Sequence, residues 1–105
     1  MPMTMRIVHT DAREALSFPD FEHGSQLEEL AQRIADALDT TALRPEGSPF
    51  ERLVGFVGYP DQFALWWDGL TCELGCSSPC GIDVDEIAVR LVASEAFTVA
   101  RDAPP

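Results

Sequence analysis

Residues 51–75 alternate large apolar side chains with small or polar ones, and turn-forming residues interrupt this alternation twice. Successive side chains of a β-strand point to opposite faces, so the pattern predicts strands with one buried face. Residues 59–62 and the dipeptide Asp68-Gly69 divide the segment into strands at 51–59, 63–67 and 70–75. We therefore expect a three-stranded antiparallel meander at the centre of the fold.

The turn lengths set the expected register of this meander. A two-residue Asp-Gly turn places Trp67 opposite Leu70, and the preceding turn places Val54 opposite Trp67. The other expected pairs are Leu65 with Cys72, Phe63 with Leu74 and Phe56 with Leu65. The face predicted to be buried consists of Val54, Phe56, Phe63, Leu65, Trp67, Leu70, Cys72 and Leu74. The opposite face consists of Leu53, Gly55, Val57, Ala64, Trp66, Thr71 and Glu73. Trp67 should then be buried, whereas Trp66 should lie beside Gly55 and be at least partly accessible.

Two amphipathic segments flank the meander and are expected to form helices. Ser25 with Glu28, and Asp83 with Glu86, match the capping-box pattern at which helices begin. The apolar residues that follow recur at helical spacing and form one stripe on each helix. These stripes contain Leu27, Leu30, Ala31, Ile34 and Leu38 in the first helix, and Val84, Ile87, Ala88, Leu91 and Val92 in the second.

The two ends of the chain add one strand each. Residues 3–9 alternate, with Met5 and Ile7 on one side, and residues 95–101 form a last strand with Phe97 and Val99 inward. Residues 11–18 fit both a short helix and a strand. The order β-α-β-β-β-α-β predicts an α+β two-layer sandwich, in which both helices pack on one face of the central antiparallel meander. A chain of 105 residues is expected to form a single domain, with its core at 3–101 and a frayed tail at 102–105.

The acidic charge limits the classes of partner. The chain has 18 Asp and Glu residues against 7 Arg, which gives a net charge of −11, and it contains neither Lys nor Asn. This charge repels phosphate backbones and anionic surfaces, so direct binding to nucleic acid or to a membrane is not expected. A basic protein partner is attracted instead, although acidity also serves solubility. Because Lys and Asn have AT-rich codons, their absence indicates a GC-rich, bacterial gene.

The helix, three strands and helix within 27–92 share their element order with double-stranded RNA-binding domains. Those domains have a basic N-terminus on their last helix, whereas here the same position reads Asp83-Val84-Asp85-Glu86. The resemblance therefore implies a shared element order without RNA binding. A run of about 20 apolar residues that would span a bilayer is absent, as is a signal-peptide pattern, so we expect a cytoplasmic protein.

Three cysteines, Cys72, Cys76 and Cys80, follow one another at equal spacing. A zinc site needs further ligands, and His9 and His23 are the candidates to supply them. A thiol or metal site at Cys72, Cys76 and Cys80 is kept as an alternative, but we expect three ordinary reduced thiols and no cofactor. Cys80 precedes the second helix, whose N-terminus favours a thiolate, although the acids there oppose it. A Cys76–Cys80 disulfide is sterically allowed but disfavoured in a reducing compartment.

The sequence contains no G-x-S-x-G, P-loop, dinucleotide fingerprint or H-E-x-x-H motif. We therefore expect a non-enzymatic protein-interaction module, and a small enzyme with an unrecognised site is a further alternative. The second face of the meander suggests a surface for a protein partner or for a second copy of the chain, because Trp and Tyr are enriched in binding hot spots. The candidate residues of this surface are Leu53, Val57, Tyr59, Asp61, Trp66 and Glu73.

A more specific hypothesis is an inhibitor or immunity-type protein, whose carboxylates imitate a phosphate array and neutralise a basic partner. Such acids must be concentrated, because exposed charges act over about 8–10 Å at physiological ionic strength. The clusters that would serve are Glu28, Glu29, Asp36 and Asp39 on the first helix, and Asp83, Asp85 and Glu86 at the start of the second.

Overall fold

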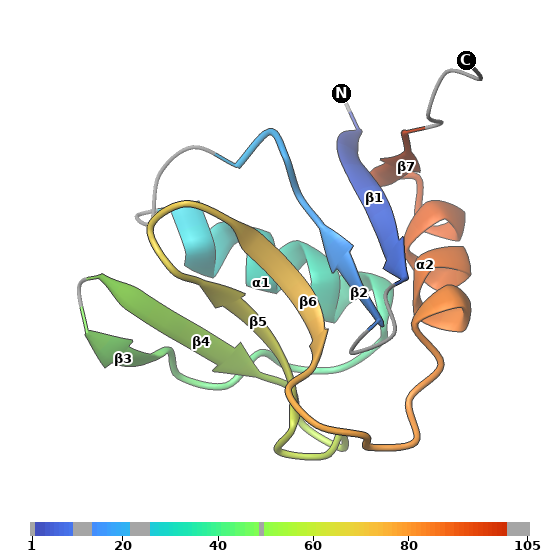
Figure 1. Cartoon of the computed structure of the whole chain (residues 1–105). Helices are drawn as coiled ribbons and strands as arrows, with labels where there is room; N and C mark the ends of the chain where they lie inside the picture. Colours follow the sequence, from blue (N-terminus) through green and yellow to red (C-terminus); the bar gives the residue numbers. More distant parts are fainter. Residues whose placement is uncertain (1, 10–13, 22–25, 49, 101–105) are drawn as a thin grey trace.

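The computed structural model describes residues 2–9, 14–21, 26–48 and 50–100. Within them a mixed sheet packs against two helices, which confirms the predicted α+β class (Figure 1). The strands are β1 (Met3–His9), β2 (Glu14–Ser17), β3 (Glu46–Ser48), β4 (Glu51–Gly55), β5 (Phe63–Trp67), β6 (Cys72–Cys76) and β7 (Phe97–Val99). The helices are α1 (Leu27–Ala37) and α2 (Val84–Ala93). The predicted frayed tail lies outside the described residues.

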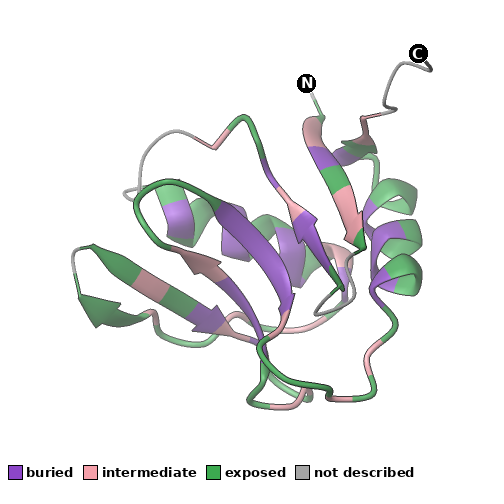
Figure 2. Ribbon diagram, in the orientation of Figure 1, coloured by how far each residue is buried: buried purple, intermediate pink, exposed green. Residues whose placement is uncertain are grey.

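The strands lie side by side in the order β3-β4-β5-β6-β2-β1-β7. All neighbouring pairs are antiparallel except β1 and β7, which are parallel. In Figure 1, α1 runs behind the predicted meander β4-β5-β6. Residues of both helices join one buried cluster with strand residues of a single face, so the two-layer arrangement is also confirmed. Figure 2 shows buried residues on both helices and on the central strands. The largest fully buried side chains are Met5, Leu16, Phe18, Leu27, Leu30, Ile34, Val54, Phe63, Leu65, Leu74 and Leu91.

Two short strands extend the predicted order. The ambiguous segment at 11–18 contains β2, which lies between β6 and β1 and buries Ala15 and Leu16. Strands β2 and β6 approach closely because Gly75 has no side chain: a Cβ there would lie 2.9 Å from the carbonyl oxygen of Glu14. Residues 40–49 contain two prolines and a glycine, from which a loop is predicted, but they include the edge strand β3, which pairs with β4.

Both hairpins of the meander differ from the predicted register by two residues. Trp67 pairs with Cys72, and Leu65 pairs with Val54 on one side and with Leu74 on the other. Because side chains alternate with a period of two, an even shift leaves each of them on its predicted face. The predicted register is therefore wrong, whereas the assignment to the two faces is correct for the residues that lie within β4, β5 and β6.

The turn between β5 and β6 explains the shift in that hairpin. The carboxylate of Asp68 accepts hydrogen bonds from the backbone N–H groups of Leu70 and Thr71, at 2.9 and 2.7 Å. These bonds stabilise a loop at 68–71 in place of a two-residue turn. Leu70 consequently lies in the loop and is 91% exposed, so its predicted burial is wrong.

The two tryptophans differ less in burial than expected. Trp67 packs against the core cluster but is only partly buried, as is Trp66, so the prediction of a buried Trp67 is wrong. Trp66 pairs with Leu53, whereas Gly55 pairs with Ala64. The expected position of Trp66 beside Gly55 is therefore also wrong, because it depended on the incorrect register.

The helices begin close to the predicted residues. Asp83 caps α2, because its side chain accepts hydrogen bonds from the backbone N–H groups of residues 85 and 86. The N-cap of α1 is Gln26, which makes no capping hydrogen bond with its side chain, and Ser25 lies outside the described residues. Val92 was expected in the buried stripe but is 42% exposed, because it lies at the edge of that stripe. Among the described residues, neither helix is long and apolar enough to cross a membrane.

Candidate functional site

A groove lies beside β4. Leu53 and Gly55 line it from the face of the sheet opposite the helices, which we call the open face, and Tyr59 lines it from the side of α2. The groove encloses about 340 Å³ and lies between β4, the segment that precedes β3 and the loop that follows β4. Its floor is apolar and its rim is charged. The side chains that define it are Leu43, Arg44, Glu46, Leu53, Phe56, Tyr59 and Asp61.

An irregularity in strand pairing lies along this groove. Ala42 forms a bridge with Phe56, and Glu46 pairs with Leu53. Residues 43–45 therefore lie opposite residues 54–55, so the outer segment contains one extra residue, as in a β-bulge. Pro45 falls within this segment and has no N–H to donate to β4. Leu43, Arg44 and Glu46 of this irregular segment line one side of the groove, and Leu53, Gly55 and Phe56 line the other.

Leu43 and Leu53 form the accessible apolar part of the groove. The backbone N–H of Leu43 donates to the carbonyl oxygen of Gly55 at 2.9 Å. A Cβ on Gly55 would lie 3.3 Å from Leu43 Cδ1, so the glycine allows the leucine side chain to lie against the strand. Leu43 is 49% exposed and Leu53 42% exposed, which makes both available to a ligand.

Tyr59 forms a wall of the groove, and contacts with Phe63 and Arg90 fix its position. Its ring stacks on Phe63, with centroids 5.0 Å apart and planes at 29°. Arg90 of α2 donates from Nη1 to the Tyr59 hydroxyl at 3.1 Å and from Nη2 to the carbonyl oxygen of Leu38 at 2.8 Å. One guanidinium group thus joins α2, the end of α1 and the groove wall, so Tyr59 is positioned before any ligand arrives.

The rim of the groove carries a small excess of negative charge. Glu46 and Asp61 are exposed carboxylates, and Arg44, two residues before Glu46, supplies one positive charge. An apolar floor beside two carboxylates suits an apolar side chain that has basic neighbours. The groove therefore offers binding chemistry, and its carboxylates are solvated rather than desolvated as catalytic acids usually are.

The structure brings together half of the predicted interaction surface. Leu53, Tyr59 and Asp61 line the groove, and Trp66 lies directly across from Leu53 on the neighbouring strand. Val57 is 52% exposed and lies in the chain between two groove residues, Phe56 and Tyr59, but is not part of the lining. Glu73 is only 5% exposed, so the expectation that it flanks this surface as an accessible acid is wrong.

Sequence reasoning missed Leu43, Glu46 and Arg90. The segment 40–49 has two prolines and a glycine, which favour a loop, and Leu43 is an isolated apolar residue without strand periodicity. That isolated leucine in a polar loop was the available signal. The contact between Arg90 and Tyr59 joins residues 31 positions apart and has no local pattern.

The predicted acidic cluster of α1 is exposed but partly neutralised. Glu29 lies 3.2 Å from Arg33, and Glu28 lies 3.8 Å from Arg52. Asp36 accepts a hydrogen bond from the side chain of Gln32 at 2.8 Å. None of these acids is among the residues that line the groove, so the two predicted surfaces share no residue.

The acids at the start of α2 have structural partners. Asp83 caps the helix, and Asp85 Oδ1 lies 3.1 Å from Nε2 of His9. The other ring nitrogen of His9, Nδ1, lies 3.4 Å from Glu14 Oε1. His9 therefore links β1, β2 and α2, and the carboxylate of Asp85 helps to hold α2 beside the sheet.

The three cysteines do not form one site. A disulfide joins Cys76 to Cys80, so the expectation that all three thiols are reduced is wrong for this pair. Cys72 is a free thiol, and burial raises its pKa to about 12. It lies four residues from Cys76 on β6, which corresponds to about 13 Å along the strand. Among the described residues no group of three His, Cys, Asp or Glu side chains has the geometry to hold a metal ion, and His23 lies outside them.

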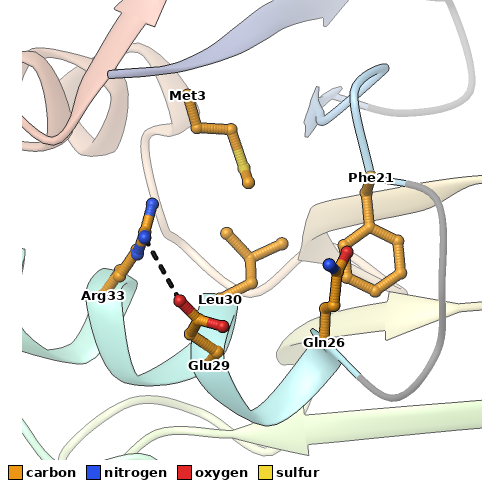
Figure 3. A pocket seen from close by; sticks show the side chains of 6 residues that line it. All are labelled: Met3, Phe21, Gln26, Glu29, Leu30 and Arg33. Carbon is orange, nitrogen blue, oxygen red and sulfur yellow. Dashed lines mark hydrogen bonds and ion pairs between the residues drawn. The ribbon is translucent and has the colours of Figure 1, made fainter. Parts of the chain in front are cut away.

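A second, smaller hollow of about 140 Å³ lies between β1 and the start of α1 (Figure 3). Met3, Leu30 and Phe21 surround it, and the Glu29–Arg33 ion pair lies at its edge. Residues 22–25, which connect Phe21 to α1, lie outside the described part of the chain. The open-face groove encloses the larger volume and has two accessible leucines in its lining, so it is the stronger candidate of the two. Comparisons of this chain with protein-family models, with curated proteins and with solved structures found no match.

Proposed function

We propose that this chain is a non-enzymatic protein-interaction module, whose open-face groove accepts an apolar side chain from a basic segment of a partner protein. The observation that supports this most is the position of two accessible leucines, Leu43 and Leu53, beside the pre-positioned ring of Tyr59. Aromatic anchors that are already ordered reduce the entropic cost of association. Residues of this type dominate binding energy in protein interfaces.

The charge of the chain favours a basic partner. The net charge of −11 is spread over a small domain, and the carboxylates of Glu46 and Asp61 lie at the groove itself. Such a field increases the association rate of a positively charged protein and makes that rate dependent on salt. A second copy of the same chain would carry the same negative charge, so self-association through this groove is disfavoured.

An inhibitor or immunity-type role is the specific form of this proposal. It requires that the module occupy a functional surface of a basic enzyme or toxin. The groove supports this role better than the acids of the two helices do, because Glu28 and Glu29 already lie near Arg52 and Arg33, and Asp85 lies within hydrogen-bond distance of His9. We therefore place the contact at the groove and assign the helical acids to long-range attraction.

Affinity capture with matched variants tests this proposal. Leu53→Arg introduces a positive charge into the groove, whereas Leu70→Arg introduces the same charge at a hairpin loop outside the groove lining. Both positions are exposed, so neither change should unfold the protein. We expect wild type and Leu70→Arg to capture the same partner at low salt, and Leu53→Arg to lose it. A partner retained equally by both variants, or captured without any dependence on salt, would contradict the proposal.

A further inference from the structure

The pair Cys76–Cys80 lies at the junction between β6 and the segment that leads to α2. Cys76 ends the strand, and the Cα atoms of the two residues are 6.2 Å apart, within the range that a disulfide requires. The residues between them, 77–79, are all exposed, and both cysteines are partly exposed. A small thiol in solution can therefore approach the sulfur atoms.

The fold has other means of holding the elements that this bond joins. Strand β6 pairs with β5 on one side and with β2 on the other. Helix α2 has its own cap at Asp83, and Leu91 on its inner face is fully buried. The bond closes a very short loop, and a short loop constrains the unfolded chain less than a long one. Opening the bond should therefore leave the sheet and α2 in place.

We infer that Cys76 and Cys80 form a reversible thiol–disulfide exchange site, whose opening releases the exposed loop 77–79. The co-reactant is a low-molecular-weight thiol of the glutathione class. This inference is independent of the groove. Disulfides that solvent can reach are usually the labile, regulatory or catalytic ones, and Cys76 and Cys80 are both partly exposed.

The exchange is balanced as a two-electron reaction. A glutathione thiolate attacks one sulfur of the Cys76–Cys80 bond, which gives a mixed disulfide and one cysteine thiolate. A second glutathione attacks the mixed disulfide, so the protein gains two thiols and one molecule of oxidised glutathione leaves. The reverse sequence re-forms the bond when oxidised glutathione is in excess.

Cys72 cannot take part in this exchange. It is 3% exposed, and its pKa is raised to about 12 by burial and by neighbouring carboxylates. The thiolate is the attacking species, so a buried thiol with this pKa is unreactive. Cys72 thus serves as an internal control, because it should count as one thiol under all conditions.

The test equilibrates the full chain in buffers of graded reduced-to-oxidised glutathione ratio. Each sample is quenched with acid, denatured, alkylated with a maleimide and weighed by mass spectrometry. We expect three maleimide labels per chain under reducing conditions and one label when the ratio of reduced to oxidised glutathione is low. The Cys72→Ala variant should show the same transition with one label fewer at each ratio. Three labels at every ratio would show that the bond does not form. Retention of the bond in reduced glutathione alone would show a permanent structural disulfide, and either result overturns the inference.

Hydrogen exchange tests the structural consequence in the same samples. The backbone N–H of Ser77 donates to the carbonyl oxygen of Gln62 at 2.9 Å, next to the disulfide. We expect the Ser77 amide to exchange faster after reduction, while the amides of β6 that pair with β5 remain protected. An unchanged Ser77 amide would show that the bond does not control the loop. In the Cys80→Ser variant, oxidised glutathione should add one glutathione at Cys76. A chain that remains unmodified would show that a small thiol reagent cannot reach the sulfur of Cys76.

Discussion

Replacing Arg90 with Met removes the guanidinium group that positions the groove wall and keeps most of the aliphatic stem. The variant loses two hydrogen bonds, one of 3.1 Å to the Tyr59 hydroxyl and one of 2.8 Å to the carbonyl oxygen of Leu38. A hydrogen bond to a charged group contributes about 1.5–3 kcal/mol when it is shielded from water. Because Arg90 is exposed and only the bond to Leu38 is part-buried, we expect a combined loss of about 2 kcal/mol in the free energy of unfolding.

Urea unfolding followed by tryptophan fluorescence measures this loss. With a denaturant slope of about 2 kcal/mol/M, the midpoint should fall by roughly 1 M while the slope stays unchanged. A double-mutant cycle with Tyr59→Phe isolates the contact with the groove wall and should give a coupling energy of about 0.5–1.5 kcal/mol. If Arg90→Met costs less than about 0.5 kcal/mol, or the coupling with Tyr59 is zero, Tyr59 is not held from the helical layer and the argument for a pre-positioned groove fails.

Three further changes test the fold. Asp83→Ala should lower stability by about 1 kcal/mol in thermal or urea unfolding, because two backbone N–H groups at the start of α2 lose their acceptor; no loss would refute the cap. Gly75→Ala should cost about 1–3 kcal/mol, since its Cβ meets the backbone of β2, whereas Gly55→Ala meets the flexible end of Leu43 and should cost less; equal effects would contradict the close approach of β2 and β6. The pKa of Asp68 is lowered from 3.8 by hydrogen bonds from the backbone of Thr71 and Leu70, so its carboxylate stabilises the fold at neutral pH and this contribution is lost as the pH falls below 3.8. The stability difference between wild type and Asp68→Ala should therefore shrink in acid, and a constant difference would argue against the loop at 68–71.

Side-chain parity made the faces of the sheet predictable, although the register was not. The period-two pattern assigned Val54, Leu65 and Leu74 to the buried face, and they are buried. The pairing of these residues depended on turn geometry, and the hydrogen bonds of Asp68 to the loop at 68–71 favoured a longer turn than the Asp-Gly pair suggests. A register error of one residue would have been more severe, because every side chain would then have changed face.

The strands β2 and β3 show where local pattern is insufficient. Residues 14–17 are too short to distinguish a strand from the end of a helix, and their conformation is decided by pairing with β6 and β1. Strand β3, with the sequence Glu-Gly-Ser, has little intrinsic strand preference and forms because it pairs with β4. Tertiary pairing therefore overrode local propensity in both places.

The candidate site was predictable only in part for the same reason. Leu53 was found by side-chain parity, and Tyr59 and Asp61 were found because they belong to the turn that follows the same predicted strand. Leu43 and Glu46 joined them through the irregular pairing of 42–48 with β4, which depends on long-range contacts. The sequence prediction disfavoured the disulfide because it assumed a reducing compartment, which is a property of the cell. In the structure Cys76 and Cys80 are close enough to be bonded.

A hydrogen-exchange footprint of the complex with the captured partner tests the central claim most directly, because it compares the groove with the helical acids in a single measurement. The groove hypothesis predicts that binding slows amide exchange at 43–46 and 53–61 and leaves α1 and the first turn of α2 unchanged. It also predicts that Leu53→Arg weakens binding by roughly tenfold or more, as expected for a hot-spot residue. Protection confined to the exposed acids of α1 and α2, with Leu53→Arg binding as tightly as wild type, would contradict it and show that the acids form the contact.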